Sequence, residues 1–342
     1  MMKLMLVGSD RGAAIEKFYI NYIRRHGGDL SFFPAHSLFH DYYYGGLLHK
    51  LLFRTGLSGI YASINRKFKQ AVNEYKPDVI WVFKGIELYP ETLGWAKARG
   101  IKLVNYNPDN PFIFSGSGSG NKNITRSIGL YDLHFTYSLD IQKQLEEHGW
   151  VPTALLPFGF ELSQEEYDAA AAQEEIVRVC FLGNPDELRA DFVADLASRG
   201  ILLDVYGGNW EKWVDHPGIR TFPPTYGLDM WKTLRRYRVQ LNLMRIHNLN
   251  SHNMRSFEVP AVGGIMLAPD TPEHRLFFEN GKEAWLYRTV TECAAMAKKL
   301  MELSPEDAGK IREQARRRSL SSGYSYENRA LQALSMIRTL DA

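Results

Sequence analysis

The stretch from residue 177 to residue 208, VRVCFLGNPDELRADFVADLASRGILLDVYGG, contains the pattern that decides the fold. An apolar run at 177–182 ends in a glycine and predicts a buried strand. A segment with helical spacing follows at 187–198 and is stopped by Gly200. A second apolar run, at 202–206, ends in a pair of glycines. A strand, a helix and a second strand in this order predict a parallel α/β unit.

The N-terminal half repeats this order of elements without repeating the sequence. Its apolar runs alternate with helical spacing and predict strands at residues 3–8, 29–35, 77–83, 101–107, 131–137 and 153–158. Two more apolar runs, at 239–244 and 264–268, extend the C-terminal half. We therefore predict an α/β protein with two doubly wound, Rossmann-like domains that face an interdomain cleft. In such sheets ligands bind at the carboxyl ends of the strands.

A polar, acidic stretch at 157–175 interrupts the alternation of strands and helices. It predicts an N-terminal domain over 1–160, a linker over 161–175 and a C-terminal domain over 176–325. The last residues, 326–342, are expected to form a helix that can cross back to the N-terminal domain.

The composition excludes several classes of protein. Of the 342 residues, 45% are hydrophobic and 23% are charged, which is typical of a globular chain and not of a disordered, collagen-like or coiled-coil one. Lys and Arg number 41 against 39 Asp and Glu, and this net charge of +2 gives no reason to expect a nucleic-acid partner.

The cysteines and the apolar runs indicate the cellular compartment of the protein. Cys180 and Cys293 lie far apart without a CxxC motif, which favours a reducing compartment. The first apolar run is too short for a signal peptide, and no run approaches the roughly 18 residues of a membrane span. We expect a cytoplasmic protein, with peripheral contact at the inner face of the membrane as a second location.

Several common motifs of cofactor and metal enzymes do not occur in the sequence. The first strand is followed by GSDRG and the run at 177–182 by GNPDE, so neither carries GxGxxG, and GxxxxGK[ST], HExxH and GxSxG are also missing. His247 and His252 are five residues apart, a spacing that suits no regular ligand pair on a helix. A dehydrogenase, a P-loop enzyme and a zinc or serine hydrolase are disfavoured, and we expect no metal and no bound cofactor.

The most informative stretch for function is NSHNMRSFEVPAVGGIMLAPD, residues 250–270. It predicts a short helix and a Gly-Gly turn before a strand. A helix N-terminus offers unpaired N–H groups, and Arg255 adds a forked cation that can hold a diphosphate. Glu258, one turn further on, can accept hydrogen bonds from ribose hydroxyls. The alternative is an ordinary Arg–Glu surface pair at i,i+3 ahead of a glycine turn.

The pattern N-x-R-x-F-E-x-x-A-x-G-G in this stretch resembles the donor-site motif of group 1-type glycosyltransferases, in particular the branch of the CgeB-like spore-maturation proteins. Other segments that resemble the family are VCFLGN (179–184), ILLDVYGGNW (201–210), VQLNLM (239–244) and PEHRLFFENGKEAWLYRT (272–289). The resemblance implies the two-domain GT-B architecture, with a nucleotide-sugar donor on the C-terminal domain and the acceptor on the N-terminal one. It also implies transfer without a bound metal.

The resemblance places Glu258 near the donor ribose and Arg255 near the phosphates. The implied donor site comprises Gly183, Asn184, Tyr206, Gly207, Asn253, Arg255, Ser256 and Glu258. Many retaining relatives have a second glutamate eight residues before the ribose glutamate, where this chain has Asn250. The stereochemical outcome is therefore left open.

Two aspartates of the N-terminal half are candidates for the base that removes a proton from the acceptor. Asp109, in YNPDNP, follows a predicted strand, and so does Asp10. Each has a structural alternative, because aspartate commonly closes a turn, as Asp109 would beside two prolines, or caps a helix, as Asp10 would.

The segment at 39–54, FHDYYYGGLLHKLLFR, combines tyrosines and leucine pairs with basic residues. Such a segment can lie on a membrane surface or hold a lipid-linked acceptor. The alternative, which we favour, is a core helix or an acceptor-side loop that packs its aromatic rings inward.

The sequence as a whole predicts a glycosyltransferase. It would move a sugar from a nucleotide-diphosphate sugar to a glycan, lipid-linked or protein acceptor, in the assembly of bacterial surface polysaccharides and glycoconjugates. Two alternatives stay open: a non-hydrolysing nucleotide-sugar epimerase, and a non-catalytic scaffold that binds a nucleotide sugar or a partner enzyme.

Overall fold

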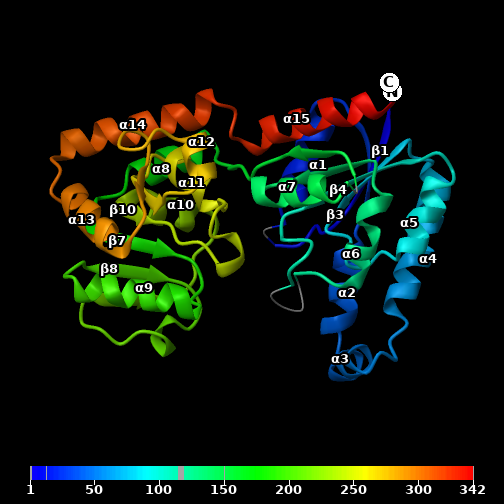
Figure 1. Cartoon of the computed structure of the whole chain (residues 1–342), viewed down its shortest axis with the longest axis horizontal. Coiled ribbons are helices and arrows are strands. Elements are labelled where there is room, and N and C mark those ends of the chain that lie inside the picture. Colours follow the sequence, from blue (N-terminus) through cyan, green and yellow to red (C-terminus); the bar gives the residue numbers. More distant parts are fainter. Residues whose placement is uncertain (1, 13, 115–118, 150, 342) are drawn as a thin grey trace. The chain divides into compact units, whose positions relative to one another are not determined.

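The computed structural model describes residues 2–12, 14–114, 119–149 and 151–341 of the chain. The chain divides into two compact units (Figure 1). The N-terminal unit contains Met1–Pro157 together with Tyr326–Ala342, and the C-terminal unit contains Phe158–Ser325. Within the described ranges each unit has one six-stranded sheet, and all the strand pairs that are assigned are parallel.

The sheet of the N-terminal unit has the strand order β2-β1-β3-β4-β5-β6. Its strands are β1 (Lys3–Val7), β2 (Asp29–Phe33), β3 (Val79–Phe83), β4 (Lys102–Asn107), β5 (Leu133–Thr136) and β6 (Thr153–Leu155). Every residue of β3, VIWVF, is buried. A continuous apolar strand of this kind is typical of a parallel sheet covered by helices on both faces. The predicted strands of this half are all present, with β6 shorter than expected.

Eight helices of the described chain belong to the N-terminal unit. They are α1 (Glu16–Arg25), α2 (Ala35–Tyr44), α3 (Leu47–Arg54), α4 (Ile60–Tyr75), α5 (Pro90–Lys97), α6 (Lys122–Ser127), α7 (Leu139–Glu147) and α15 (Tyr326–Arg338). The last of them comes from the end of the chain and packs on α1, where Tyr326 stacks on Phe18 with ring centroids 4.8 Å apart. His26 and Glu327 add an ion pair at 2.8 Å. The final segment of the chain is therefore part of the first unit.

The sheet of the C-terminal unit has the strand order β12-β11-β10-β7-β8-β9. Its strands are β7 (Ile176–Leu182), β8 (Leu203–Tyr206), β9 (Ile219–Phe222), β10 (Tyr237–Leu241), β11 (Met266–Pro269) and β12 (Trp285–Tyr287). This is the order of the dinucleotide-binding type of doubly wound sheet. The short strands β9 and β12, at the two edges of the sheet, were not predicted from the sequence.

The helices of the C-terminal unit correct one expectation about the domain boundary. They are α8 (Gln164–Ala171), α9 (Glu187–Ser198), α10 (Gly227–Arg236), α11 (Arg255–Ala261), α12 (Pro272–Phe277), α13 (Val290–Met301) and α14 (Pro305–Ser321). The segment 161–175 was expected to be a linker, but α8 lies within it and packs on α10. Ser163 and Glu166 form a capping box at the start of α8, so these polar residues begin a helix.

Glu175, at the end of the same segment, binds two buried arginines. Its carboxylate accepts hydrogen bonds from Arg238 at 2.5 and 2.9 Å and from Arg312 at 2.6 Å. Hydrogen bonding to Arg238, with the charge of Arg312, holds the pKa of Glu175 below its usual value. The acidic composition that suggested a linker instead supplies the counter-charge for two arginines of the C-terminal unit.

The strand order reverses at one position in each sheet. This position lies between β1 and β3 in the first unit and between β7 and β10 in the second. Loops that leave the sheet at such a point diverge and leave a crevice at the carboxyl ends of the strands. Candidate site residues are therefore expected after β1 and β3, and after β7 and β10. None of the described helices is long and apolar enough to cross a membrane.

Candidate functional site

A pocket of about 120 Å³ lies at the carboxyl ends of β7 and β8 in the C-terminal unit. Five predicted donor-site residues line it: Gly183, Asn184, Tyr206, Gly207 and Arg255. The rest of the lining is Leu182 and the loop Pro224-Thr225-Tyr226, which the sequence analysis did not single out. Parallel strands end at the same edge of a sheet, so Gly183, Gly207 and Arg255 meet here although they are 24 and 48 positions apart along the chain.

The two glycine turns of this pocket touch each other. The carbonyl oxygen of Gly183 accepts a hydrogen bond of 2.8 Å from the indole Nε1 of Trp210. A Cβ on Gly207 would lie well inside van der Waals contact of that same carbonyl oxygen and 2.8 Å from Trp210 Nε1. Asn184 Oδ1 accepts a hydrogen bond of 3.1 Å from the backbone N–H of Gly208. Glycine is required at 207 because backbone fills the space where a side chain would begin.

Arg255 is the cation of the pocket. Its Nε donates to the carbonyl oxygen of Leu182 at 3.4 Å, and its guanidinium forms an ion pair with Glu258 three residues on. The Arg255 side chain is 25% exposed, whereas that of Glu258 is 7% exposed. The Arg–Glu pair considered from the sequence is therefore present, but it is largely buried and its arginine lines the pocket. Glu258 itself is not among the lining residues.

Tyr206 lines the pocket and is held by two aromatic neighbours. Its ring stacks on Phe222 with centroids 4.7 Å apart, and its hydroxyl is 3.0 Å from that of Tyr237. Tyr237 in turn donates to Asp204 at 2.7 Å. An aromatic face held in this way can stack with a nucleobase.

The Asp204 carboxylate beneath Tyr206 is fully buried and is paired with Arg178 and Arg220. Burial alone would raise the pKa of Asp204, but hydrogen bonds from Arg220 and Tyr237 and the charge of Arg178 hold it below its usual value. The charged form is therefore kept at neutral pH, and it fixes Tyr237 and, through it, Tyr206.

Asn253 and Ser256 do not line the pocket, although the resemblance placed both in the donor site. Each backbone N–H donates to the side-chain oxygen of the other at 3.2 Å, which closes the turn at the start of α11. The side-chain amide of Asn253 also donates to Asn242 at 2.8 Å. In the structure both residues serve to position α11, which carries Arg255.

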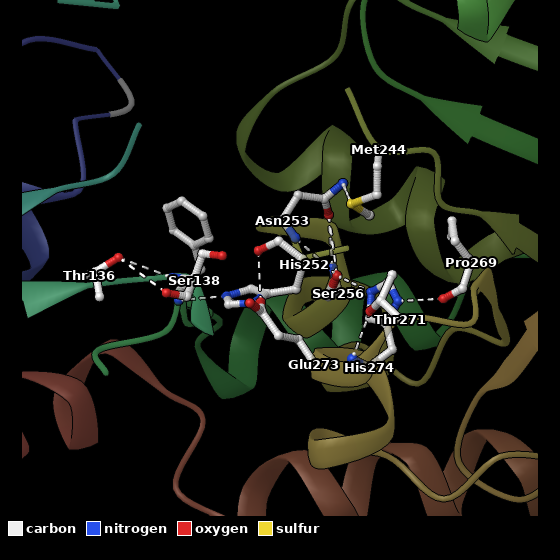
Figure 2. Close-up of polar contacts among 12 residues, drawn as sticks. Thr136, Ser138, Met244, His252, Asn253, Ser256, Pro269, Thr271, Glu273 and His274 are labelled. Atoms are coloured by element: carbon white, nitrogen blue, oxygen red, sulfur yellow. Dashed lines mark hydrogen bonds and ion pairs between the residues drawn. The ribbon is translucent and has the colours of Figure 1, made fainter. Parts of the chain in front are cut away.

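Figure 2 shows how this turn continues into a buried polar network. The Ser256 hydroxyl lies 2.8 Å from Nε2 of His274, whose Nδ1 lies 2.7 Å from the carbonyl oxygen of Pro269. Since a carbonyl only accepts, Nδ1 carries the proton and Nε2 accepts from Ser256. Burial lowers the pKa of His274 to about 4, so this histidine is neutral at pH 7.

His252 belongs to the same region and is completely buried. It pairs with the buried carboxylate of Glu273, and its Nε2 accepts from the backbone N–H of Phe158 at 3.2 Å. Ser251 donates to the same carboxylate at 2.7 Å. Among the described residues no group of three or more His, Cys, Asp or Glu side chains is placed to hold a metal ion.

The candidate bases of the N-terminal unit lie at the carboxyl ends of β1 and β4. Asp109 forms an ion pair of 2.6 Å with Lys84, which follows β3 and has a left-handed backbone with φ of 57°. A non-glycine residue in this conformation is uncommon and often marks a functional site. Asp10 accepts a hydrogen bond of 2.5 Å from the hydroxyl of Ser37.

A second polar pair at this edge, His36 and Glu87, was not predicted from the sequence. His36 Nδ1 is 2.7 Å from the Glu87 carboxylate, and their side chains are 39% and 5% exposed. The hydrogen bond to Glu87 raises the pKa of His36. Glu16, whose Oε1 accepts from Ser9 N at 3.0 Å, lies close enough to Lys84 and His36 to interact with both charges. Burial raises the pKa of Glu16. Asp109 was chosen as a candidate because it follows a predicted strand. The same criterion would have identified His36, which follows β2.

Comparison with known proteins agrees with the fold. Residues 189–335 match the model of a family described as glycosyl transferase-like. Sucrose-phosphate synthase from Thermosynechococcus elongatus is similar over 99% of both chains, with a TM-score of 0.66 and 12% identity. Anabaena HepE in complex with UDP-glucose has a TM-score of 0.66 and 14% identity over 99% of this chain and 100% of that one.

A third similar structure belongs to a different kind of enzyme. UDP-GlcNAc 2-epimerase from Neisseria meningitidis, bound to UDP-GlcNAc, has a TM-score of 0.58 and 13% identity over 99% of this chain and 100% of that one. No curated protein sequence matches the chain. The two parallel α/β units are those of the GT-B fold, so the predicted fold class is confirmed. The predicted spore-maturation branch stays a prediction.

The close approach of the two glycine turns gives a testable prediction. Gly207→Ala should lower the free energy of unfolding by about 2 kcal/mol, because the new Cβ must displace backbone. Gly208→Ala is the matched control, since a Cβ there meets only the Asn184 side chain at 3.8 Å. Urea unfolding of the two variants measures the difference. Equal stability of the two would contradict the contact.

The buried His274 gives a pH prediction. Its folded pKa of about 4 lies below the unfolded value, so the unfolded chain binds a proton more readily between pH 6.5 and 4. The stability it contributes is present above pH 6.5 and is lost as the pH falls through this range, by about 2 kcal/mol at pH 5. In His274→Gln, the fall in unfolding free energy from pH 7 to pH 5 should be smaller by that amount. The same fall in both proteins would show that His274 is not buried in its neutral form.

Proposed function

We propose that the protein is a glycosyltransferase that uses a nucleotide-diphosphate sugar as its donor. The observation that carries the proposal is the pocket at the ends of β7 and β8, where two glycine turns and Arg255 meet. Glycine turns allow a ligand's phosphates to approach the backbone, and arginine binds phosphate oxygens through two parallel hydrogen bonds. The match of residues 189–335 to a glycosyl transferase-like family supports the same reading.

The donor is proposed to bind with its diphosphate at Arg255 and its base or ribose against Tyr206. Both residues line the pocket, and both are held by neighbours: Arg255 by Glu258 and the Leu182 carbonyl, Tyr206 by Phe222 and Tyr237. Side chains fixed before the ligand arrives lose little conformational entropy on binding. Glu258, expected at the ribose, is assigned here to holding Arg255 in place.

The acceptor is proposed to be a hydroxyl of a glycan, a lipid-linked saccharide or a protein, bound by the N-terminal unit. Its oxygen forms the new bond to the anomeric carbon while the bond from that carbon to the diphosphate breaks, and the electron pair leaves with the diphosphate. The hydroxyl proton passes to a base. Asp109 and Asp10 remain our candidates, and His36, oriented by the buried carboxylate of Glu87, joins them.

A panel of nucleotides tests the donor proposal. UDP, GDP, dTDP, ADP, CMP and NAD are added separately to the purified chain, and the melting temperature is measured. A ligand that binds only the folded state raises it by mass action. UDP is the first probe, because two of the similar structures contain UDP-glucose and UDP-GlcNAc. A rise with one nucleoside diphosphate supports the proposal, and no rise with any of them contradicts it.

Product analysis then separates the three classes considered from the sequence. Incubation with UDP-glucose and UDP-GlcNAc should release UDP slowly by transfer of the sugar to water. Formation of a second sugar nucleotide without acceptor would instead identify an epimerase. Binding without any turnover, with or without a mixture of glycan acceptors, would identify a scaffold.

Arg255→Ala tests the phosphate role directly. The variant should bind UDP about ten to a hundred times more weakly, because a charge-assisted hydrogen bond contributes about 1.5–3 kcal/mol, and should bind uridine almost as the parent does. Isothermal titration calorimetry measures both ligands. Arg199→Ala is the control, since Arg199 pairs with Asp195 on the exposed face of α9 and does not line the pocket. Equal weakening of UDP and uridine would rule out the phosphate role.

A further inference from the structure

Helices α2 and α3 form a hairpin on the N-terminal unit, joined by Gly45 and Gly46. In Figure 1, α3 is at the lower end of this unit, beyond α2. None of the eight residues of α3 is buried. The helix is therefore attached to the unit along one side and presents the other to its surroundings.

The side by which α3 is attached is aromatic. Phe53 contacts Phe39, Tyr43 and Tyr61, with ring centroids 4.9, 5.6 and 5.6 Å apart. Phe39, Tyr43 and Phe53 belong to the segment 39–54, whose aromatic rings were expected to pack inward, whereas Tyr44 of the same segment is exposed.

Four leucines of α3 and of the turn after it face outward. Leu47, Leu48 and Leu51 are 85%, 64% and 59% exposed, and Leu57, just after the helix, is 76% exposed. Positions 47, 48 and 51 lie on one face of a helix, about opposite Phe53. Single exposed leucines are ordinary on a protein surface, but four within eleven residues form a patch that marks an interaction site.

The charged residues of α3 are both positive, and the nearest acidic residue before it, Asp41 on α2, is paired with Arg11. The sequence from residue 42 to residue 73 contains no Asp or Glu, and it contains Lys50, Arg54, Arg66, Lys67 and Lys69. Lys50 and Arg54 are on α3 itself, next to the leucine face. The ammonium of Lys50 lies 4.7 Å from the ring centroid of Tyr44, which is also exposed. A leucine face flanked by cations and tyrosine is the composition of a helix that lies in the interface of a bilayer.

We infer that α3 and the turn after it dock on an anionic lipid surface. Leu47, Leu48, Leu51 and Leu57 enter the boundary between headgroups and acyl chains, while Lys50 and Arg54 contact the anionic headgroups. The lack of acidic residues favours this occupant over a second copy of the chain, because two such surfaces would bring like charges together. The inference does not depend on the proposed sugar transfer, since the hairpin contributes no residue to the pocket of the C-terminal unit.

Vesicle flotation of the full chain tests the inference. The protein is mixed with phosphatidylcholine vesicles containing 30% phosphatidylglycerol, or none, and the fraction that floats is measured. We expect binding to the anionic vesicles at least tenfold stronger than to the neutral ones, with a decrease at high salt. Absence of flotation with both compositions overturns the inference.

Two sets of variants identify the surface that binds. The triple variant Leu47→Gln, Leu51→Gln and Leu57→Gln should lose at least tenfold in binding, and so should Lys50→Glu with Arg54→Glu. The matched controls are Leu202→Gln with Leu276→Gln and Leu320→Gln, and Lys298→Glu with Lys299→Glu, all exposed positions of the C-terminal unit. An unchanged melting temperature shows that each variant is folded.

The flotation of the variants and a measurement without lipid together decide whether α3 docks on lipid. Loss in the hairpin variants alone supports docking through α3, and equal loss in the controls overturns it. Sedimentation without lipid detects the competing occupant: a dimer of the parent chain that the leucine variant abolishes, with no flotation, would show that a second copy covers the patch. Failure of the nucleotide panel would leave the flotation result unaffected.

Discussion

The pocket of the C-terminal unit depends on one close contact between two turns. The backbone of Gly207 lies against the carbonyl oxygen of Gly183, and Trp210 donates a hydrogen bond to the same oxygen. A side chain on Gly207 would separate the turns that follow β7 and β8. Because the contact is between backbones, it holds the two turns together and leaves glycines where a ligand's phosphates can approach closely.

The buried charge of Asp204, on β8, determines the orientation of the neighbouring side chains. Asp204 is held ionised by Arg178 and Arg220, and it orients Tyr237 and through it Tyr206. A buried carboxylate stays ionised only where hydrogen bonds and counter-charges satisfy it, so this arrangement is specific in geometry. In the N-terminal unit the buried side chain of Glu87 lies 2.7 Å from Nδ1 of His36 and orients this half-exposed ring.

Much of the fold could be predicted because strands and helices follow from local patterns. The apolar run at β7, the glycine after it and the helical spacing of α9 are each visible within about ten residues. The segment 161–175 was predicted to be a linker because it is polar. In the structure its polar residues cap α8 and neutralise two buried arginines. Composition alone does not distinguish a solvated acidic residue from one that neutralises a distant cation.

The sequence by itself determined the two α/β units and identified the residues that follow the strands as candidates for the site. It could do so because hydrophobic periodicity and the positions of glycines are local properties of the chain. Only the tertiary structure decided which of those residues meet. It placed Arg255 and Tyr206 in one pocket and assigned Ser256 to the network of His274. It also packed Phe53 of α3 against aromatic rings of the N-terminal unit and left Leu47, Leu48 and Leu51 exposed. These outcomes depend on contacts between distant segments, which no local pattern encodes.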